Sequence, residues 1–175
     1  MIYIFEGING CGKTTLAKFN AQHFGYTYLK MSTSTPDWSY VYKNNKDPRI
    51  IDDAFRLHQD FFTKVIAPVI ETGKPVVLDR SFPSIYAYQC ASPAQKILWH
   101  VNFSKMPRSL KHARLIYVET ALDECVKRLR LRDGEQTPSM VQKLLERLQR
   151  YEEMRENGYF YKTVSGVDAP LRVVL

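Results

Sequence analysis

The sequence has no apolar stretch that approaches the length of a membrane span, so it predicts no transmembrane segment. It has only three cysteines, Cys11, Cys90 and Cys125. This odd, scattered set argues against a disulfide framework and favours a reducing compartment, which we expect to be the cytoplasm. The chain starts with a strand-like run and no basic leader, so we expect no signal or transit peptide. Repeats, low-complexity tracts and linkers are also absent, and the 175 residues are expected to form a single domain.

Positive charge exceeds negative charge, with 25 Lys and Arg against 18 Asp and Glu and a net charge of +7 at pH 7. A basic surface can bind nucleic acid, or it can form a pocket that collects several phosphates. Several arginines fall within residues 128–132, which favours the pocket. Aromatic residues interleaved with basic ones, which would form a platform for single strands, are missing. We therefore expect neither nucleic acid nor a membrane as partner.

Short apolar runs alternate with segments of helical spacing along the chain. We expect strands at residues 2–5, 26–31, 76–78, 115–118 and 159–164, with 171–175 closing the chain. We expect helices after the first strand and at residues 50–72, 83–90, 93–104, 121–131 and 139–156. Loops are expected at 132–138 and at 32–48, the latter with room for one helical turn. Pro68 is expected to kink its helix, and Ser139 to cap the last one. The alternation predicts an α/β fold, a parallel sheet of about five strands with helices on both faces.

A glycine-rich loop joins the first strand to the first helix. Residues 7–14 have the complete phosphate-loop pattern, Gly-x-x-x-x-Gly-Lys-Thr, in the right order between strand and helix. Glycines let backbone N–H groups wrap a phosphate, and the helix N-terminus adds partial positive charge. Lys13 is predicted to reach the outer phosphates, and the Thr14 hydroxyl to ligate Mg²⁺. The candidate nucleotide-binding residues are Gly7, Asn9, Gly10, Cys11, Gly12, Lys13, Thr14 and Thr15.

Asp79 and Arg80 directly follow a buried strand, where ligands of open α/β sheets bind. Asp79 is predicted to approach Mg²⁺, directly or through water, and Arg80 to hold a second phosphate. The alternative is an Asp–Arg pair that only caps the next helix. Motor and helicase ATPases usually end this strand in Asp-Glu, where the Glu activates water. An Arg in that place favours a phosphorylated acceptor over hydrolysis.

Arg128, Arg130 and Arg132 stand at the end of a predicted helix and enter a glycine-containing loop. Phosphoryl transfer builds up negative charge, which arginines on a closing flap can stabilise while they exclude water. We predict a lid at about residues 128–138, with these three arginines as catalytic groups. The alternative is a solvated helix end, where basic residues also suit the helix dipole.

Phe55, Arg56, His58 and Gln59 lie on the helix before Asp79. A Phe ring can stack on a base, and Arg or Gln can read the edge of a base. Phe55, Arg56 and Gln59 are therefore candidates for binding the substrate. Core packing of Phe55 is the alternative.

Two stretches resemble the thymidylate kinase family. Residues 5–15 are similar to that family's phosphate loop, Phe-Glu-Gly-x-Asp-Gly-x-Gly-Lys-Thr-Thr, and residues 79–89 to its Asp-Arg-Tyr-x-x-Ser-x-x-Ala-Tyr-Gln. The second match is the more diagnostic, because many NTPases share the phosphate loop. The resemblance implies that Arg80 holds the phosphate of a nucleoside monophosphate, that Ser84 and Gln89 lie along its base and sugar, and that Phe55 stacks on the pyrimidine. It also implies that the three arginines of residues 128–132 form the lid.

The sequence departs from the family pattern at several positions. Asn9 stands where the family has an Asp, and residues 30–32 replace the family's Arg-Glu-Pro after the second strand. Ser81 replaces the Tyr after Asp-Arg, which is similar to the Glu-Arg-Ser of the related deoxynucleoside kinases. Arg56, His58 and Gln59 compete for the place of the family's base-reading Arg.

We therefore predict an ATP-dependent kinase that uses Mg²⁺ and phosphorylates a pyrimidine deoxynucleoside monophosphate, dTMP to dTDP, in DNA-precursor synthesis. A deoxynucleoside kinase is the first alternative, and a nucleic-acid-end kinase or nucleic-acid-binding NTPase the second. A GTPase switch is disfavoured because the guanine-reading motif is missing. The resemblance also implies a homodimer, because members of that family are commonly dimers. Residues 50–70 offer a candidate surface, although core packing is the favoured interpretation of most of those positions. A chain this short and divergent would suit a phage or viral enzyme.

Overall fold

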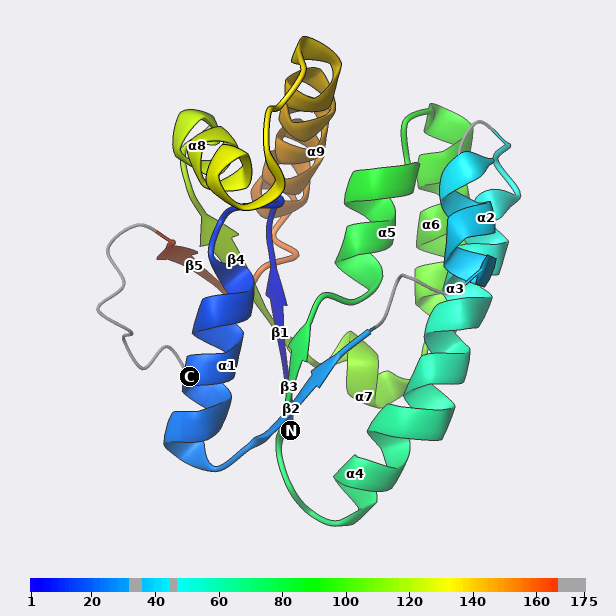
Figure 1. The fold of residues 1–175 in the computed structure, drawn as a ribbon. Helices are drawn as coiled ribbons and strands as arrows, with labels where there is room; N and C mark the ends of the chain where they lie inside the picture. Colours follow the sequence, from blue (N-terminus) through cyan, green and yellow to red (C-terminus); the bar gives the residue numbers. More distant parts are fainter. Residues whose placement is uncertain (32–35, 45–46, 167–175) are drawn as a thin grey trace.

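The computed structural model describes residues 1–31, 36–44 and 47–166. Parallel strands form one sheet in the order β2-β3-β1-β4-β5 (Figure 1). The strands are β1 Ile2–Glu6, β2 Thr27–Lys30, β3 Val76–Asp79, β4 Arg114–Glu119 and β5 Lys162–Ser165. Each connection between strands passes through helices, as parallel pairing requires. The predicted five-stranded α/β fold is thus confirmed, whereas the expected closing segment 171–175 lies outside the described residues.

Helices cover both faces of the sheet (Figure 1). One layer contains α1 Lys13–Phe24, α8 Leu122–Asp133 and α9 Pro138–Glu156. The other contains α2 Pro36–Lys43, α3 Ile50–Phe61, η1 Phe62–Ile66, α4 Ala67–Glu71, α5 Phe82–Gln89, α6 Pro93–Lys105 and α7 Arg108–Lys111. The long helix α9 also packs against α5, so it links the two layers above the sheet. Within the described residues, none of the helices has the length and apolarity needed to cross a membrane.

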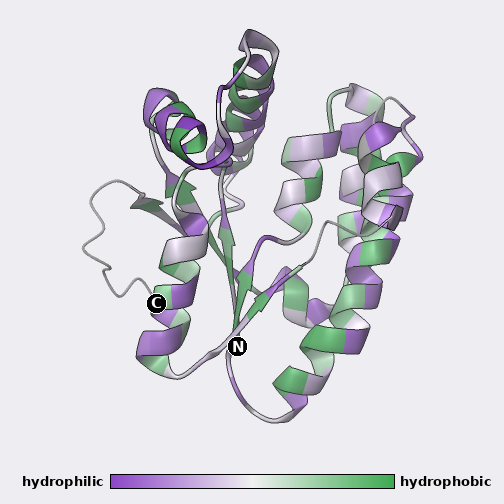
Figure 2. Cartoon of the chain, viewed as in Figure 1, coloured by the Kyte–Doolittle hydropathy of each residue, from purple (hydrophilic) through white to green (hydrophobic). Residues whose placement is uncertain are grey.

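The central strand β1 shows why the apolar runs are continuous. Its side chains alternate between the two hydrophobic clusters, with Ile2 and Ile4 in one and Tyr3 and Phe5 in the other. A strand covered by helices on both faces has no polar side, which is typical of parallel sheets. Figure 2 shows hydrophobic residues in the strands, and helices that carry both hydrophobic and hydrophilic residues.

The helical region 50–71 is interrupted by a wide turn, η1. There the Ala67 N–H bonds to the carbonyl of Phe62, five residues earlier. Pro68 has no N–H, and its ring would clash with the carbonyl four residues earlier in a regular helix. The wide turn accommodates Pro68, as π-type turns do in many kinked helices. The helix is therefore irregular just before Pro68, the residue at which the kink was predicted.

Part of the stretch predicted as the loop 32–48 is helical. Residues 36–43 form α2, with Pro36 at its first position and Asp37 in its first turn, both of which suit a helix N-terminus. Trp38 and Val41 lie one turn apart and are buried in the core. The two residues give too short a periodicity to predict a helix of this length from the sequence.

The boundary between α8 and α9 was also predicted wrongly. Helix α8 continues to Asp133, so Arg132 lies in a helix and not in a loop. Thr137, not Ser139, caps α9, because its hydroxyl accepts a hydrogen bond from the Met140 N–H at 3.3 Å. Pro138 then occupies the first helical position, where a missing N–H costs nothing.

Candidate active site

The loop between β1 and α1 is tightly packed at its glycines. Gly10 has a φ of +86°, and a Cβ atom there would lie 2.6 Å from the carbonyl oxygen of Cys125 in α8. A Cβ atom at Gly7 would lie 2.7 Å from the carbonyl oxygen of Val118 in β4. Both positions therefore require glycine, for conformation and for space. The phosphate loop is held between the end of β4 and the start of α8.

Lys13 is the first residue of α1 and is buried. Its ammonium group donates a hydrogen bond to the carbonyl oxygen of Ile8 in the loop, at 3.1 Å. Burial, together with the nearby Arg80 guanidinium, lowers the pKa of Lys13 to about 8. A phosphate anion in the loop would favour the charged form, so the site is suited to an anionic ligand.

Asp79, at the end of β3, is buried and shares one carboxylate oxygen between two donors. Its Oδ2 accepts hydrogen bonds from the Thr14 hydroxyl at 2.6 Å and from the Tyr28 hydroxyl at 3.1 Å. Its Oδ1 is buried without a partner among the described residues. An unpartnered carboxylate oxygen beside a hydroxyl is a donor set that suits Mg²⁺, which prefers oxygen ligands and takes the remainder from water and phosphate.

Arg80 has a φ of +74°, the left-handed region that non-glycine residues rarely adopt. Its guanidinium group is held by four hydrogen bonds, to Asn9 Oδ1 at 2.6 Å, the Tyr88 hydroxyl at 2.7 Å, Ser84 Oγ at 3.0 Å and the Tyr151 hydroxyl at 3.3 Å. Backbone strain of this kind persists only where the surroundings overdetermine it, and such strain clusters at functional sites.

Glu6 lies beneath Arg80 and is fully buried. Its carboxylate accepts hydrogen bonds from the Ser81 N–H at 2.6 Å, Ser84 Oγ at 2.7 Å and the Tyr151 hydroxyl at 2.8 Å. Burial raises the pKa of Glu6, while Arg80 at 4.0 Å and these hydrogen bonds oppose the rise. The carboxylate thus ties β1, α5 and α9 together under the site.

Two pockets meet at the carboxyl ends of β1 and β3. The larger, which we call the phosphate-loop pocket, has a volume of about 700 Å³, and the smaller, the side pocket, about 260 Å³. Asn9, Met31 and Arg80 line both. Of the predicted nucleotide-binding residues, six line the phosphate-loop pocket: Asn9, Gly10, Gly12, Lys13, Thr14 and Thr15. Gly7 and the buried Cys11 lie behind it and shape the loop.

The side pocket contains two of the predicted substrate-binding residues, Ser84 and Gln89. Gln89 is buried, and its side-chain oxygen has no hydrogen-bond partner among the described residues. Because an unpaired buried acceptor is costly, this oxygen is suited to accept a hydrogen bond from a ligand.

The predicted arginine cluster divides between two surfaces. Arg128 and Arg132 line the phosphate-loop pocket, and Arg128 donates hydrogen bonds to the carbonyl oxygens of Gly10 at 3.3 Å and Gly166 at 3.1 Å. Arg130 is exposed and belongs to a separate hollow on the outside of α8. The structure therefore does not bring Arg130 to the site with the other two.

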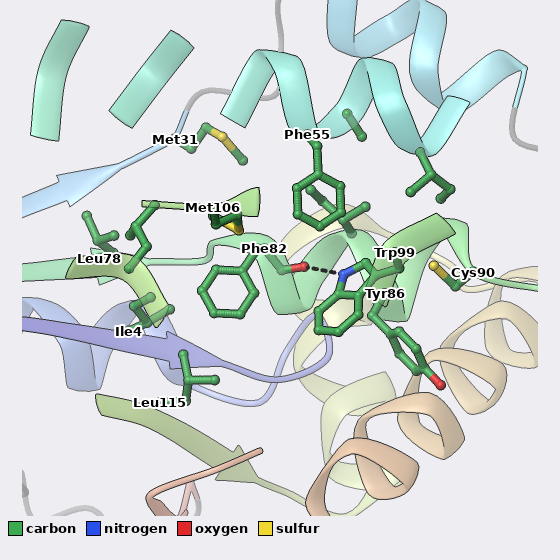
Figure 3. Packing of buried hydrophobic residues seen from close by; sticks show 14 of the residues in the cluster. Ile4, Met31, Phe55, Leu78, Phe82, Tyr86, Cys90, Trp99, Met106 and Leu115 are labelled. Carbon is green, nitrogen blue, oxygen red and sulfur yellow. Dashed lines mark hydrogen bonds between the residues drawn. The ribbon is translucent and has the colours of Figure 1, made fainter. Parts of the chain in front are cut away.

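Phe55, Arg56 and Gln59 do not line either pocket. Phe55 is buried in the core, where its ring meets Trp99 edge to face at a centroid distance of 6.2 Å (Figure 3). Arg56 is exposed and donates to Asp53 at 3.1 Å, and Gln59 is exposed. The core-packing alternative thus describes Phe55, and the base-reading role has no support for these three residues.

Several residues of the side pocket were not identified from the sequence, and three of them are large aromatic or charged side chains. Trp38 comes from α2, Tyr88 from α5 and Arg147 from α9. Tyr88 stands within the stretch 79–89 that resembles the family motif, so the motif already pointed to it. Trp38 lay in the presumed loop. Arg147 precedes Tyr151 by one helical turn, but no motif marks it.

A parallel α/β sheet with a phosphate loop, a Thr–Asp oxygen pair and arginines around two joined pockets defines a P-loop kinase. A family model of thymidylate kinase matches residues 5–168. The chain therefore belongs to the thymidylate kinase family, and its enzyme class is that of the ATP-dependent nucleotide kinases.

Relatives with similar sequences are also thymidylate kinases. A probable thymidylate kinase of Thermococcus kodakarensis is 30% identical over 151 residues, which cover 75% of this chain and 72% of the relative. The thymidylate kinase of Xanthomonas campestris pv. campestris is 31% identical over 119 residues, 61% of this chain and 52% of the relative. The chain thus spans about half the length of the second relative.

Solved structures share the fold at lower identity. The YorR protein of Bacillus subtilis, solved with phosphorylated GDP, has a TM-score of 0.63 at 17% identity and covers 98% of this chain and 89% of its own. The deoxyadenosine kinase of M. mycoides with bound dATP has a TM-score of 0.61 at 16% identity, with 99% and 95% covered. The thymidylate kinase of Ehrlichia chaffeensis has a TM-score of 0.58 at 19% identity, with 94% and 91% covered.

Proposed function

We propose that the protein transfers the γ-phosphoryl group of Mg-ATP to dTMP and yields dTDP, a precursor for DNA synthesis. The observation that carries this proposal is the position of Arg80, which lines both pockets. One guanidinium group thus borders the place for the donor phosphates and the place for the acceptor. A P-loop kinase needs such a junction, because transfer depends on alignment of the two phosphates and on neutralising their charge.

The donor side rests on the phosphate loop. Lys13 would hold the outer phosphates of ATP, with the loop N–H groups, in place of its present bond to the Ile8 carbonyl. Thr14 and Asp79 would hold Mg²⁺, which neutralises charge on the phosphates when bound. Arg128 and Arg132 would stabilise the transferring group from the lid at residues 128–138.

The acceptor side rests on the side pocket. Arg80 would position the acceptor phosphate, while Ser84 and Gln89 would face its sugar and base. Trp38 and Tyr88 take the place that we expected Phe55 to fill, as the aromatic side chains of the pocket. The family relatives support dTMP as the acceptor.

The experiment is ATP-dependent product formation with Mg²⁺ against thymidine, dTMP, dUMP, dCMP, dGMP and a 5′-hydroxyl oligonucleotide. We expect turnover of dTMP above all others. Turnover of thymidine without dTMP would instead identify a deoxynucleoside kinase, and strongly salt-dependent oligonucleotide binding without nucleotide turnover would overturn both.

Two variants test the assigned roles. Lys13→Ala and Arg80→Ala should each lower kcat/KM by roughly 10²–10³-fold, because each removes a charge aimed at a phosphate. Lys105→Ala, which removes an exposed lysine at the end of α6, is the matched control and should keep normal turnover. Near-normal turnover in either site variant would contradict its assignment.

A further inference from the structure

Arg147 is a half-buried arginine of α9 that lines the side pocket. Its guanidinium carbon lies 4.2 Å from the ring centroid of Tyr88. This stacking positions the group, and its N–H donors, which point outward in the guanidinium plane, make no hydrogen bond or ion pair with the residues that the structure describes.

No carboxylate pairs with Arg147 among the described residues. Its neighbours at helical spacing are Lys143, Leu144, Arg150 and Tyr151, none of which is acidic. The other two arginines of α9 differ in this respect. Arg150 contacts Glu146 at 3.7 Å, and Arg155 pairs with Glu152 and Glu119.

The same tyrosine ring brings Arg147 close to Arg80. The Arg80 guanidinium carbon lies 4.8 Å from the Tyr88 ring centroid, and the Tyr88 hydroxyl donates to Asn9 Oδ1 at 3.0 Å. Two cations thus flank one ring beside the pocket. Glu6 offsets only Arg80, from beneath, at 4.0 Å. The uncompensated positive charge favours an anion in the side pocket.

Another part of the same pocket requires a hydrogen-bond donor instead of an anion. The buried Gln89 oxygen has no partner and needs a donor. A ligand that offers an anion to the two arginines and an N–H donor to Gln89 satisfies both. A nucleoside monophosphate with an N–H on its base is such a ligand, whereas a nucleoside supplies only the donor.

We propose that Arg147 binds the phosphate of the acceptor together with Arg80, and so selects a nucleoside monophosphate over a nucleoside. The inference rests on the proposed function, since it names a further specificity-determining residue for that reaction. Arg147 contributes the second guanidinium group, and the Tyr88 ring contacts both groups where they line the side pocket.

The test is the affinity of the full chain for dTMP and for thymidine, measured by titration calorimetry. Arg147→Met removes the charge but keeps an unbranched side chain that can pack on the Tyr88 ring. We expect dTMP binding to weaken by about tenfold or more, and thymidine binding to stay within about twofold. Arg147→Lys, which retains the charge, should recover part of the loss.

Lys143→Met is the matched control, because it removes one exposed positive charge one turn earlier on the same helix. It should leave both affinities within about twofold, which separates local binding from the general field of a basic protein. In steady-state turnover, Arg147→Met should raise KM for dTMP more than it lowers kcat.

The outcomes distinguish this inference from the proposed function. If the wild-type chain turns over dTMP and Arg147→Met binds dTMP as tightly, the inference is wrong and the proposed function stands. Equal weakening of dTMP and thymidine would also overturn the inference, because Arg147 would then act through packing or on the base. A wild-type chain without activity on any nucleoside monophosphate would overturn both.

Discussion

His58 should make the protein lose stability in mild acid. It lies in α3, is 1% exposed, and neither ring nitrogen has a hydrogen-bond partner among the described residues. Burial lowers the pKa of His58 from 6.5 to about 4, because the charged ring would have to leave water without a compensating partner. The unfolded chain keeps the ordinary pKa, so it takes up a proton at a pH where the folded chain does not.

The magnitude follows from this difference in pKa. Stability decreases as the pH is lowered wherever the unfolded state binds more protons, by about 1.36 kcal/mol per pH unit for one group. The loss attributable to His58 starts near pH 6.5 and ends near pH 4, where the folded state also becomes protonated. At pH 5 it amounts to about 2 kcal/mol, a large fraction of the free energy of unfolding of a domain of this size.

The assay is urea unfolding at pH 7.5 and pH 5, followed by circular dichroism, for wild type and His58→Leu. Leucine cannot titrate, and it replaces a ring whose nitrogens have no hydrogen-bond partner among the described residues, so stability at pH 7.5 should be equal or higher. The variant should lose about 2 kcal/mol less than wild type between the two pH values. His23→Leu, at an exposed position of α1, is the control and should behave as wild type. An identical loss in His58→Leu and wild type would refute the reasoning.

Three further predictions concern the site and its surroundings. Arg128→Ala should lower kcat by about tenfold or more, whereas Arg130→Ala should keep kcat within about twofold of wild type, because, of these two, only Arg128 faces the phosphate loop. Equal losses in ATP-dependent turnover would show that α8 rotates or that both arginines act at a distance. Phe55→Ala should lower the free energy of unfolding by about 3–4 kcal/mol in urea titrations, since Phe55 packs on Trp99. It should leave KM for the acceptor unchanged in the folded fraction. A raised KM without a loss of stability would restore its base-stacking role. Gly10→Ala should weaken ATP binding in calorimetry by at least about tenfold, because the new methyl group meets the backbone of α8 and strains a positive φ; unchanged affinity would mean that the loop is less constrained than its geometry indicates.

The sequence predicted best what depends on neighbours along the chain. The phosphate loop combines a strand, a glycine turn and a helix within 24 residues, and each part has its own local signal. The sheet was predictable because parallel strands are buried on both faces and so read as continuous apolar runs. The helix boundaries near Thr137 were less clear, because Ser139 was an equally good cap by residue type and only the position of Pro138 distinguishes the two.

The split of the arginine cluster follows from helical geometry. Residues two apart on a helix point roughly 200° apart, whereas residues four apart share a face. Arg130 therefore had to face away from Arg128 and Arg132 if all three were helical. Arg128 and Arg130 already lay within the predicted helix 121–131, so helical spacing alone separates them; the longer α8 adds only that Arg132 shares the face of Arg128.

The acceptor side resisted prediction because its residues come from elements that are distant in sequence. Trp38, Tyr88 and Arg147 reach one pocket from α2, α5 and α9, and each has an ordinary structural explanation when read alone. For Phe55 the sequence suggested a functional role instead of hiding one, because an aromatic residue on a helix beside a catalytic strand can stack on a base. Yet Ile51 and Phe55 share one face of α3, and that face is buried, so periodicity already favoured the core. The side chains that line the side pocket determine the substrate. They come together only because α9 packs against α5, and no local sequence pattern encodes that packing.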